Sequence, residues 1–385
     1  MASPFARVLG SLQSALGLPQ SSGSVLGIDI GSSSAKIVQV RSNRGTVVLE
    51  TYGEIALGPY AGQEVGKTVR LTNEKIGEAI NDLMREANIT AKSGGISIPF
   101  SSSLITVLDM PKADKEQISR MIPIEARKYI PVPVSEVMLD WFIIPEEEKS
   151  DAFDRVEKET MMQKRGQEVL LVAIHKDVLK NYQDITHSVG VTASFYEIEI
   201  FSTVRSSLGH GVAPKIVVDI GASATKLYVV ERGVVRMTHL VNIGSQQMTE
   251  TLGRSLNWSF EKAERIKRET GLNPSTSYSR EENDQVREAL LSTLNRLFSE
   301  INRVLLSYGK RYNKTVSHVV LTGGGSSLPG LSGVAKEVLS TDVELANPFA
   351  KVETPAFLDE VLRDIGPGFA VSLGVALRKL QQSNR

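Results

Sequence analysis

Residues 25–40 read VLGIDIGSSSAKIVQV, an apolar run that stops at an aspartate, a glycine and three serines before it becomes apolar again. Residues 216–230 read IVVDIGASATKLYVV, and aligning Asp29 with Asp219 makes the aspartate, isoleucine, glycine, one serine and a lysine coincide. Each copy continues through a short turn into another apolar stretch, which predicts a meander of three strands with a tight, hydroxyl-lined first turn. We therefore predict two related lobes that open on the same motif.

The composition indicates a globular chain without a general affinity for nucleic acid. A length of 385 residues is too great for one ordinary core, which agrees with two lobes. Lys+Arg and Asp+Glu both number 44, so the formal net charge is zero and no nucleic-acid partner is expected. The absence of cysteine excludes disulfides, thiolate metal sites and cysteine nucleophiles. The histidines are scattered, and none lies four residues from another as a helical metal pair would.

The first 24 residues are predicted to be a tail separate from the lobes. Polar residues interrupt its apolar run, which makes it a poor signal peptide, and the chain holds no run of about 18 apolar residues that would predict a membrane-spanning helix. The tail's apolar residues that fall on one helical face are Phe5, Val8, Leu9, Leu12 and Leu16. As an amphipathic helix, this tail would dock on a partner or a membrane surface; alternatively, it packs lightly on its own protein as a frayed tail.

Helical segments are predicted after each meander. Thr72 is a suitable N-cap for a helix whose apolar residues recur at helical spacing as far as Ala87. In the second half, residues 259–270 and 282–309 are predicted to be helical. The longer helix leads into SHVVLTGGGSSLPGL, residues 317–331, an apolar strand that ends in three glycines and opens a further helix.

Residues 96–195 are predicted to form a small α+β domain inserted in the first lobe. Strand patterns, a helix broken by prolines and a strand–helix pair follow one another there. Within this region, residues 146–168 carry many charges without apolar periodicity, which predicts a mobile exposed loop.

The two Asp-x-Gly-x-Ser turns have the chemistry of phosphate-binding loops. Consecutive amide N–H groups with serine hydroxyls make a concave donor surface that binds anions. Asp29 and Asp219 fit such a site if Mg²⁺ lies between them, since Mg²⁺ keeps several waters and is held by one or two carboxylates and by substrate phosphates. Lys36 either neutralises phosphate charge or points to solvent. The glycine turn at 323–326 would let a base and a ribose lie against bare backbone at a helix start.

Residues 61–68, AGQEVGKT, come close to a P-loop but do not match it. The pattern G-x-x-x-x-G-K-[ST] requires glycine where the chain has Ala61, and Gly62 lies one residue too near Gly66. No convincing apolar strand leads into the segment. We interpret it as a polar loop before the helix that Thr72 caps.

The order of these motifs resembles the actin-like ATPase superfamily, within it most closely the PilM family of type IV pilus assembly, and next the FtsA family of cell division. The stretches that carry the resemblance to PilM are GIDIGSSSAK, IEARKYIPVPVSEVMLDW, IVVDIGASATKLYVV and FAVSLGVALR. The resemblance implies an α/β fold, a two-lobed actin-like ATPase of ribonuclease H-like repeats with a small α+β, SHS2-like insertion domain in the first lobe. The implied division is a tail at 1–24, a first lobe at 25–95 and 196–215 to which residues 365–385 return, the insertion at 96–195, and a second lobe at 216–364.

The resemblance also implies a nucleotide site for ATP or ADP with Mg²⁺. The implied residues are Asp29, Gly31, Ser32, Ser33, Ser34 and Lys36 in the first phosphate loop, Asp219, Gly221, Ala222 and Ser223 in the second, and Gly323, Gly324, Gly325 and Ser326 at the adenosine. Asp29 and Asp219 would hold Mg²⁺ through water. Relatives place residues such as Glu264 and Lys267 against the ribose and base, although two residues three apart on a helix also form ordinary ion pairs.

For catalysis, the resemblance points to YEIEIFSTVRSSLG, residues 196–209, which links the lobes. Actin-like enzymes orient the attacking water with an acidic or amide side chain in this segment. Glu199 is therefore the candidate catalytic residue, with Glu197 behind it, and either side chain is alternatively structural. Because phosphoryl transfer depends mostly on positioning, a site with a misplaced water would bind ATP and barely hydrolyse it. Weak or absent ATPase activity is expected.

By resemblance, the chain is expected to be a cytoplasmic, ATP-binding component of the type IV pilus inner-membrane assembly platform, with indirect membrane contact. Its expected partner is the N-terminal cytoplasmic tail of a PilN-like inner-membrane protein, for which the insertion and the first lobe would form a groove. The tail would bind in extended form, either against a sheet edge or in an apolar groove. The segment Ile96 to Met110 supplies candidate groove residues. The alternatives are self-association as an FtsA-like membrane-associated filament protein, and an actin-like ATPase or kinase with substantial turnover.

Overall fold

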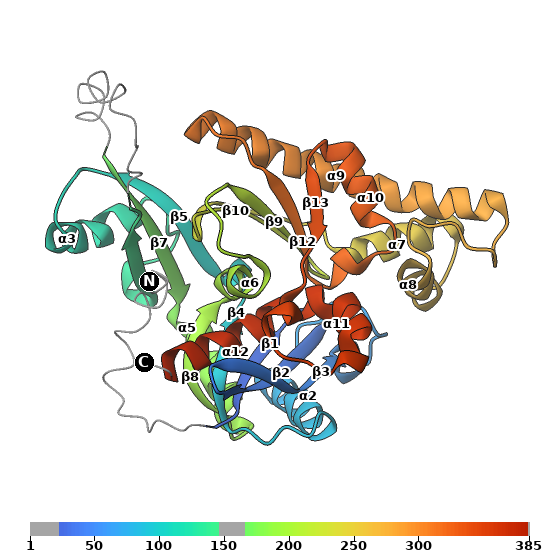
Figure 1. Cartoon of the computed structure of the whole chain (residues 1–385), viewed down its shortest axis with the longest axis horizontal. Coiled ribbons are helices and arrows are strands. Elements are labelled where there is room, and N and C mark those ends of the chain that lie inside the picture. The colour runs from blue at the N-terminus through green and yellow to red at the C-terminus, as the bar shows by residue number, and fades with distance from the viewer. Residues whose placement is uncertain (1–22, 146–165, 384–385) are drawn as a thin grey trace.

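The computed structural model describes residues 23–145 and 166–383, which form two lobes with a smaller sheet beside them (Figure 1). The apolar face expected in the first residues, and most of the loop expected at 146–168, lie outside the described residues. Among the residues described, no helix combines the length and the apolar character needed to cross a membrane.

The first lobe contains a five-stranded sheet in the order β3-β2-β1-β4-β8. Its strands are β1 (Val25–Ile30), β2 (Ser34–Asn43), β3 (Thr46–Ala56), β4 (Ser93–Ile98) and β8 (Thr192–Ile198). The first three form the predicted antiparallel meander, and β4 and β8 continue it in parallel. One face packs on α2 (Asn73–Glu86) and α5 (Lys176–Ser188), and the other packs on α12 (Ala370–Ser383).

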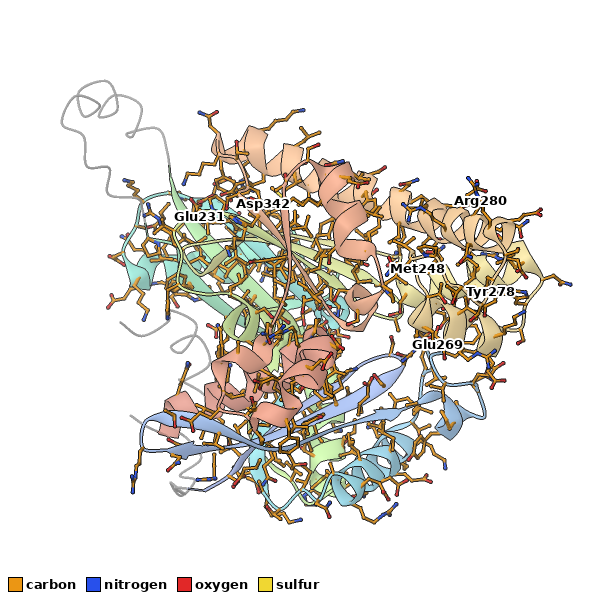
Figure 2. All side chains as sticks on the ribbon, turned by 45° about the vertical axis from the view of Figure 1, so that its right-hand side comes forward. Glu231, Met248, Glu269, Tyr278, Arg280 and Asp342 are labelled. Carbon is orange, nitrogen blue, oxygen red and sulfur yellow. The ribbon has the colours of Figure 1, made fainter. Side chains whose placement is uncertain are left out.

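The second lobe repeats this arrangement in the order β11-β10-β9-β12-β13. Its strands are β9 (Lys215–Ile220), β10 (Thr225–Glu231), β11 (Val234–Val241), β12 (His318–Thr322) and β13 (Asp342–Leu345). Its outer helices are α7 (Ser245–Leu256), α8 (Phe260–Glu269), α9 (Arg280–Tyr312) and α10 (Leu331–Leu339). Figure 2 labels Met248, a buried residue of α7 in the core of this lobe, and Arg280, which marks the exposed start of α9. The repeated motif therefore corresponds to a repeated sheet topology.

The two sheets meet across α6 (Glu199–Ser207) and α12. Ile200 and Phe201 of α6 pack against Val217 and Val320 on the inner face of the second sheet. The same helix is tied to α12 by a hydrogen bond from Ser206 Oγ to the carbonyl of residue 370, at 2.6 Å. These two helices therefore set the distance between the lobes.

A separate antiparallel sheet, in the order β5-β7-β6, forms the insertion. Its strands are β5 (Ser103–Met110), β6 (Val137–Ile143) and β7 (Gln167–His175), and α3 (Lys115–Ala126) covers one face. The separate sheet is smaller than the range 96–195 expected from the sequence, because β4, α5 and β8 belong to the first lobe's sheet and its helical cover. An apolar strand pattern does not state which sheet the strand joins, and β4 and β8 pair in parallel with strands of the first lobe.

Short helices connect the larger elements. They are η2 (Gly58–Ala61), η3 (Phe100–Ser102), η4 (Val134–Glu136), η6 (Gly324–Ser327), η7 (Pro348–Lys351), η8 (Ala356–Leu358), α11 (Asp359–Ile365) and η9 (Gly366–Phe369). The predicted N-cap is present, since Thr72 Oγ1 accepts a hydrogen bond from the Lys75 N–H. The long helix α9 starts at a capping box between Ser279 and Glu282 and extends slightly beyond the predicted 282–309.

Candidate functional site

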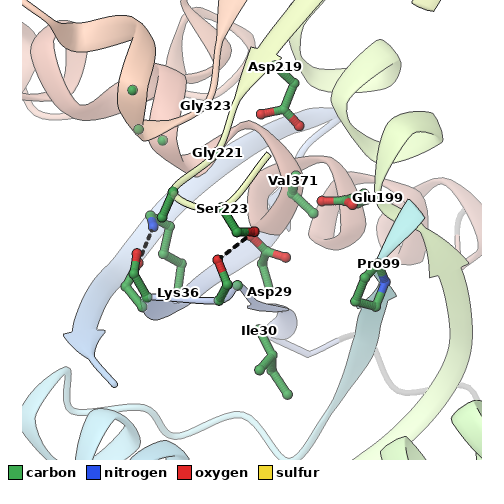
Figure 3. Close-up of a pocket in the computed structure, with 18 of the residues that line it drawn as sticks. Asp29, Ile30, Lys36, Pro99, Glu199, Asp219, Gly221, Ser223, Gly323 and Val371 are labelled. Carbon is green, nitrogen blue, oxygen red and sulfur yellow. Dashed lines mark hydrogen bonds between the residues drawn. The ribbon is translucent and has the colours of Figure 1, made fainter. Parts of the chain in front are cut away.

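A cavity of about 850 Å³ lies between the lobes where β1, β9 and β12 end (Figure 3). The predicted residues that line it are Asp29, Gly31, Ser32, Ser33, Ser34, Lys36, Glu199, Asp219, Gly221, Ala222, Ser223, Glu264, Lys267, Gly323, Gly324 and Gly325. Ser326 is the exception: its hydroxyl donates to the Gly323 carbonyl at 2.7 Å and the residue is buried. The structure therefore brings together residues from three distant parts of the chain.

The two Asp-x-Gly loops have the same backbone turn. The Gly31 N–H donates to the Ser34 carbonyl at 3.0 Å, and the Gly221 N–H donates to the Ala224 carbonyl at 3.0 Å. Across the cavity, Ser32 Oγ donates to Ser223 Oγ at 3.1 Å (Figure 3). The loops therefore face each other closely enough for one ligand to contact both.

The glycine turn after β12 approaches the second loop too closely for a side chain. Gly323 has a φ of +80°, and a Cβ there would lie 2.3 Å from Asp219 Oδ1 and 2.6 Å from the Ile220 carbonyl oxygen. Both the left-handed backbone and the close approach require glycine. This leaves bare backbone along one wall of the cavity.

Asp29 and Asp219 stand at the ends of β1 and β9. Asp29 Oδ1 accepts a hydrogen bond of 2.6 Å from Ser97 Oγ, and burial raises the pKa of this carboxyl. Asp219 accepts from Lys226 Nζ at 3.2 Å. The described residues contain no group of three or more His, Cys, Asp or Glu side chains arranged as direct metal ligands. Two carboxylates on facing loops fit Mg²⁺ held through water rather than a site made only of protein ligands.

Glu199, the first residue of α6, lies in the cavity wall (Figure 3). Both of its carboxylate oxygens accept hydrogen bonds. Oε1 accepts from the Phe100 N–H at 2.7 Å, and Oε2 accepts from Lys226 Nζ at 2.8 Å. Burial raises its pKa, and Lys226 opposes this effect. Glu199 therefore has the predicted position, but its oxygens already hold two donors.

Lys226 is a site residue that the sequence reasoning missed. The signal was present, because Lys226 aligns with Lys36 in the repeated motif. Lys36 itself lines the cavity and contacts Ser34 Oγ at 2.7 Å and Glu54 Oε1 at 2.8 Å. Of the two orientations considered for Lys36, the structure therefore supports the one toward the cavity. Glu54, from β3, gave no sequence signal.

Glu264 and Lys267 line the cavity and also form an ion pair. Lys267 Nζ lies 2.6 Å from Glu264 Oε2, and Thr249 Oγ1 donates to the same oxygen at 2.5 Å. Burial would raise the pKa of Glu264, but Lys267 outweighs it and the pKa is lowered. The nucleoside contact and the helical ion pair are compatible interpretations, because the two side chains pair with each other and also line the cavity.

Glu197 does not line the cavity. It accepts a bidentate pair of hydrogen bonds from Arg205 at 2.7 Å each and another from Arg378 at 2.8 Å. Burial raises its pKa, but the two guanidinium groups outweigh this and lower the pKa to about 2. Glu197 is therefore a structural anion that joins β8, α6 and α12.

The P-loop-like residues lie on a segment of the first lobe, between η2 and α2, that contacts the second lobe. In this crossing segment, residues 62–71, the Thr68 N–H donates to Gln246 Oε1 at 2.6 Å. Lys67 Nζ lies 5.0 Å from the centre of the Phe260 ring. Gly66, with a φ of +93°, packs against the Glu264 carboxylate. The segment thus joins the lobes at the cavity mouth and does not form a phosphate loop.

The segment Ile96 to Met110, which is expected to supply groove residues, is divided between β4 and β5. Ile96 and Ile98 are buried within β4, at the interior of the first sheet. The outer edge of β5 contacts β11, where Thr238 Oγ1 donates to the Ile105 carbonyl at 3.0 Å. The other edge strand of the insertion is β6, whose residues are mostly half-buried.

Comparisons with known proteins agree with this geometry. A sequence profile of the family described as type IV pilus assembly protein PilM matches residues 27–380. The chain is 22% identical to cell division protein FtsA of Bacillus subtilis over 370 residues, which cover 87% of this chain and 81% of FtsA. It is 23% identical to FtsA of Enterococcus faecalis over 351 residues, covering 85% and 79% of the two chains.

Solved structures show the same fold. The PilM-PilN type IV pilus biogenesis complex has a TM-score of 0.75 at 23% identity, covering 94% of this chain and 99% of that one. MreB5 of Spiroplasma citri bound to AMPPNP has a TM-score of 0.50 at 13% identity, covering 94% and 98%. The fold is therefore that of the actin-like ATPases. Because the profile match extends from β1 into α12, the chain belongs to the PilM family of type IV pilus assembly proteins.

Proposed function

We propose that this chain is a cytoplasmic component of the type IV pilus assembly platform that binds ATP or ADP with Mg²⁺ between its lobes and holds the cytoplasmic tail of a PilN-like membrane protein. The observation that carries the nucleotide part is the pair of facing Asp-x-Gly loops, joined by the 3.1 Å contact between Ser32 and Ser223. Together they offer amide and hydroxyl donors to one polyphosphate. MreB5 of Spiroplasma citri, which shares the fold, was solved with AMPPNP and with ADP.

Within this proposal, the two loops hold the phosphates and the glycine turn at 323–325 lies against the adenosine. Asp29 and Asp219 hold Mg²⁺ through its waters, and the ion when bound neutralises phosphate charge. Glu264 and Lys267 contact the nucleoside from α8. Glu199 is engaged by the Phe100 N–H and Lys226, which supports slow or absent turnover.

The partner part rests on the relative solved as a PilM-PilN complex and on β6, which among the described strands stands at the edge of the insertion sheet. An extended tail adds to a sheet edge through main-chain hydrogen bonds, while pockets beside the edge select alternate side chains. Asp140, on β6, is the acid of this edge, and burial raises its pKa to about 6. The positive charge of Arg378 on α12 acts against this effect of burial.

Two measurements test the proposal. Nucleotide extracted from the purified protein is identified and quantified, and phosphate release from added ATP is followed over hours. Bound ATP or ADP with almost no release supports a nucleotide-stabilised scaffold, whereas steady turnover favours the enzyme alternative, and no binding in Mg²⁺ rejects the site.

The partner is tested by calorimetric titration with a synthetic peptide of the PilN-like N-terminus from the same organism. Saturable binding that is lost in Phe142→Ala and kept in Tyr129→Ala is the expected result. Both aromatic side chains belong to the insertion, but only Phe142 lies on β6, on the face that also carries Asp140. Absence of binding to the unmodified protein contradicts the proposed partner.

A further inference from the structure

Lys226, on β10, lies where the acidic side chains of the cavity converge. Its Nζ donates to Glu199 Oε2 at 2.8 Å and to Asp219 Oδ2 at 3.2 Å, and its side chain is 17% exposed. A Cβ built on Gly221 would lie 3.7 Å from the same nitrogen. The ammonium group therefore touches the second Asp-x-Gly loop and two acids that come from different elements.

Without Lys226, this part of the cavity would carry uncompensated negative charge. Asp29, Asp219 and Glu199 all line the cavity, and a polyphosphate would add more negative charge to it. The field of a fixed ammonium group is strong in such a site, because little water is present to screen it.

The other two lysines that line the cavity have acidic partners of their own. Lys36 Nζ lies 2.8 Å from Glu54, and Lys267 Nζ lies 2.6 Å from Glu264. Lys226 is protonated at physiological pH, because Asp219 and Glu199 raise its pKa by more than burial lowers it. Among the lysines that line the cavity, Lys226 is thus the one whose Nζ contacts both Asp219, of the second Asp-x-Gly motif, and Glu199, of α6.

We propose that Lys226 is a built-in cation of the nucleotide site, which compensates Asp219 and Glu199 and attracts the polyphosphate, so that nucleotide binding depends only partly on a divalent ion. This inference rests on the proposed function, because it concerns the same cavity. The inference adds a role for Lys226 in the site. It also adds retention of nucleotide without Mg²⁺, which the motif alone does not predict.

The test is the affinity of the full chain for ATP, measured in excess Mg²⁺ and in excess EDTA. Lys226→Met is expected to weaken binding by roughly tenfold or more in EDTA and by clearly less in Mg²⁺, since the divalent ion takes over part of the charge compensation. Lys75→Met is the matched control, because Lys75 is exposed on α2 and pairs only with its helical neighbour Glu78. Equal weakening in the two conditions would overturn the proposal.

Removing one partner of a buried ion pair also threatens folding. The variant Lys226→Met with Glu199→Gln removes both charges and is expected to recover thermal stability relative to Lys226→Met alone. It is also expected to recover only part of the affinity lost in EDTA, because the repulsion from Glu199 is gone but the ammonium group that attracts the polyphosphate is still absent. Full recovery of that affinity in the double variant would overturn the proposal that Lys226 attracts the polyphosphate. An unmodified protein that binds no ATP in either condition would instead reject the proposed function itself.

Discussion

Asp29 is a half-buried acid at the end of β1, and it lines the cavity. Asp29→Ala is expected to weaken nucleotide binding in Mg²⁺ by roughly tenfold or more, because one of two carboxylates that hold the hydrated ion is lost. The fold should persist, since the loss of the Ser97 hydrogen bond, about 1 kcal/mol, is offset by removing a buried charge. Calorimetric titration with ATP and a thermal melt measure the two effects.

The control for this variant is Asp284→Ala, at an exposed position on α9 that does not line the cavity. It should change neither affinity nor melting temperature. If Asp29→Ala binds nucleotide as the unmodified protein does in Mg²⁺, Asp29 has no role with the ion.

Glu197 is the opposite case, an acid whose charge stabilises the fold. Its pKa falls from 4.5 to about 2, because Arg205 and Arg378 outweigh the effect of burial. The folded-state pKa lies below the unfolded value, so this stabilisation is complete above pH 4.5 and is lost as the pH falls toward 2. Glu197→Gln should lower the free energy of unfolding by about 3–5 kcal/mol at neutral pH.

Denaturant unfolding at several pH values measures this effect. The deficit of Glu197→Gln should shrink below pH 4.5, where the unmodified carboxyl begins to lose its advantage. Glu125→Gln removes an exposed pair with Lys128 and should cost about 0–1 kcal/mol. A deficit that is independent of pH would show that the destabilisation is not electrostatic.

At the residue scale, the motifs located the loops because their chemistry is local. A turn of glycine and serine is visible in sequence, and so are Asp29 and Asp219 beside it. The engagement of Glu199 by Phe100 and Lys226 was not visible, because it depends on a backbone N–H and a side chain from other strands. For the same reason, Glu197 could not be separated from Glu199 before the position of Arg378 was known.

At the scale of elements, the crossing segment ties the lobes together at the cavity mouth. Gln246→Ala removes the acceptor of the Thr68 N–H, a hydrogen bond of 2.6 Å between the lobes. If the segment retains nucleotide, dissociation should be about fivefold faster, as expected for a loss of about 1 kcal/mol. Stopped-flow displacement of a fluorescent ATP analogue measures the rate.

Gln183→Ala provides the comparison, because Gln183 is an exposed residue of α5 outside the cavity. Its dissociation rate should match that of the unmodified protein. If Gln246→Ala also leaves the rate unchanged, the crossing segment joins the lobes without controlling nucleotide release.

Sequence patterns predicted the helices and strands better than they predicted which sheet each strand joins. The meanders, the Thr72 cap and the long helix α9 depend on local spacing, and the structure contains them. The insertion sheet was harder to delimit, since β4 and β8 join the first sheet through pairing between residues about a hundred positions apart. The crossing segment likewise looked like a failed P-loop until its contacts with the second lobe were known.

At the scale of the whole molecule, the repeat predicted two lobes, but not how they meet. Their arrangement depends on α6 and α12, which pack between the sheets, and on contacts between distant residues. Glu199 belongs to this junction and to the cavity at once. Its hydrogen bond from Phe100 connects the cavity to η3, which leads directly into β5 of the insertion.

This connection predicts that nucleotide and partner tail influence each other's binding. Nucleotide that changes the Lys226–Glu199–Phe100 contacts would shift the insertion relative to the first lobe, and so change the proposed tail site along β6. A ligand shifts such an equilibrium only by its difference in affinity for the two arrangements, and typical couplings change affinity by about 5-fold or more. We therefore expect the affinity of the tail peptide to differ by at least that factor between ATP-loaded and nucleotide-free protein.

Titration of the peptide in both states measures the coupling, and titration of ATP with and without peptide must give the same factor. Glu199→Gln should reduce the coupling while keeping peptide affinity in the nucleotide-free state, because the amide still accepts from the Phe100 N–H but loses the ionic contact with Lys226. Asp29→Ala, with weakened nucleotide binding, should respond to ATP only at higher concentration. Equal peptide affinity in the loaded and empty protein would mean that nucleotide stabilises the lobes without signalling to the insertion.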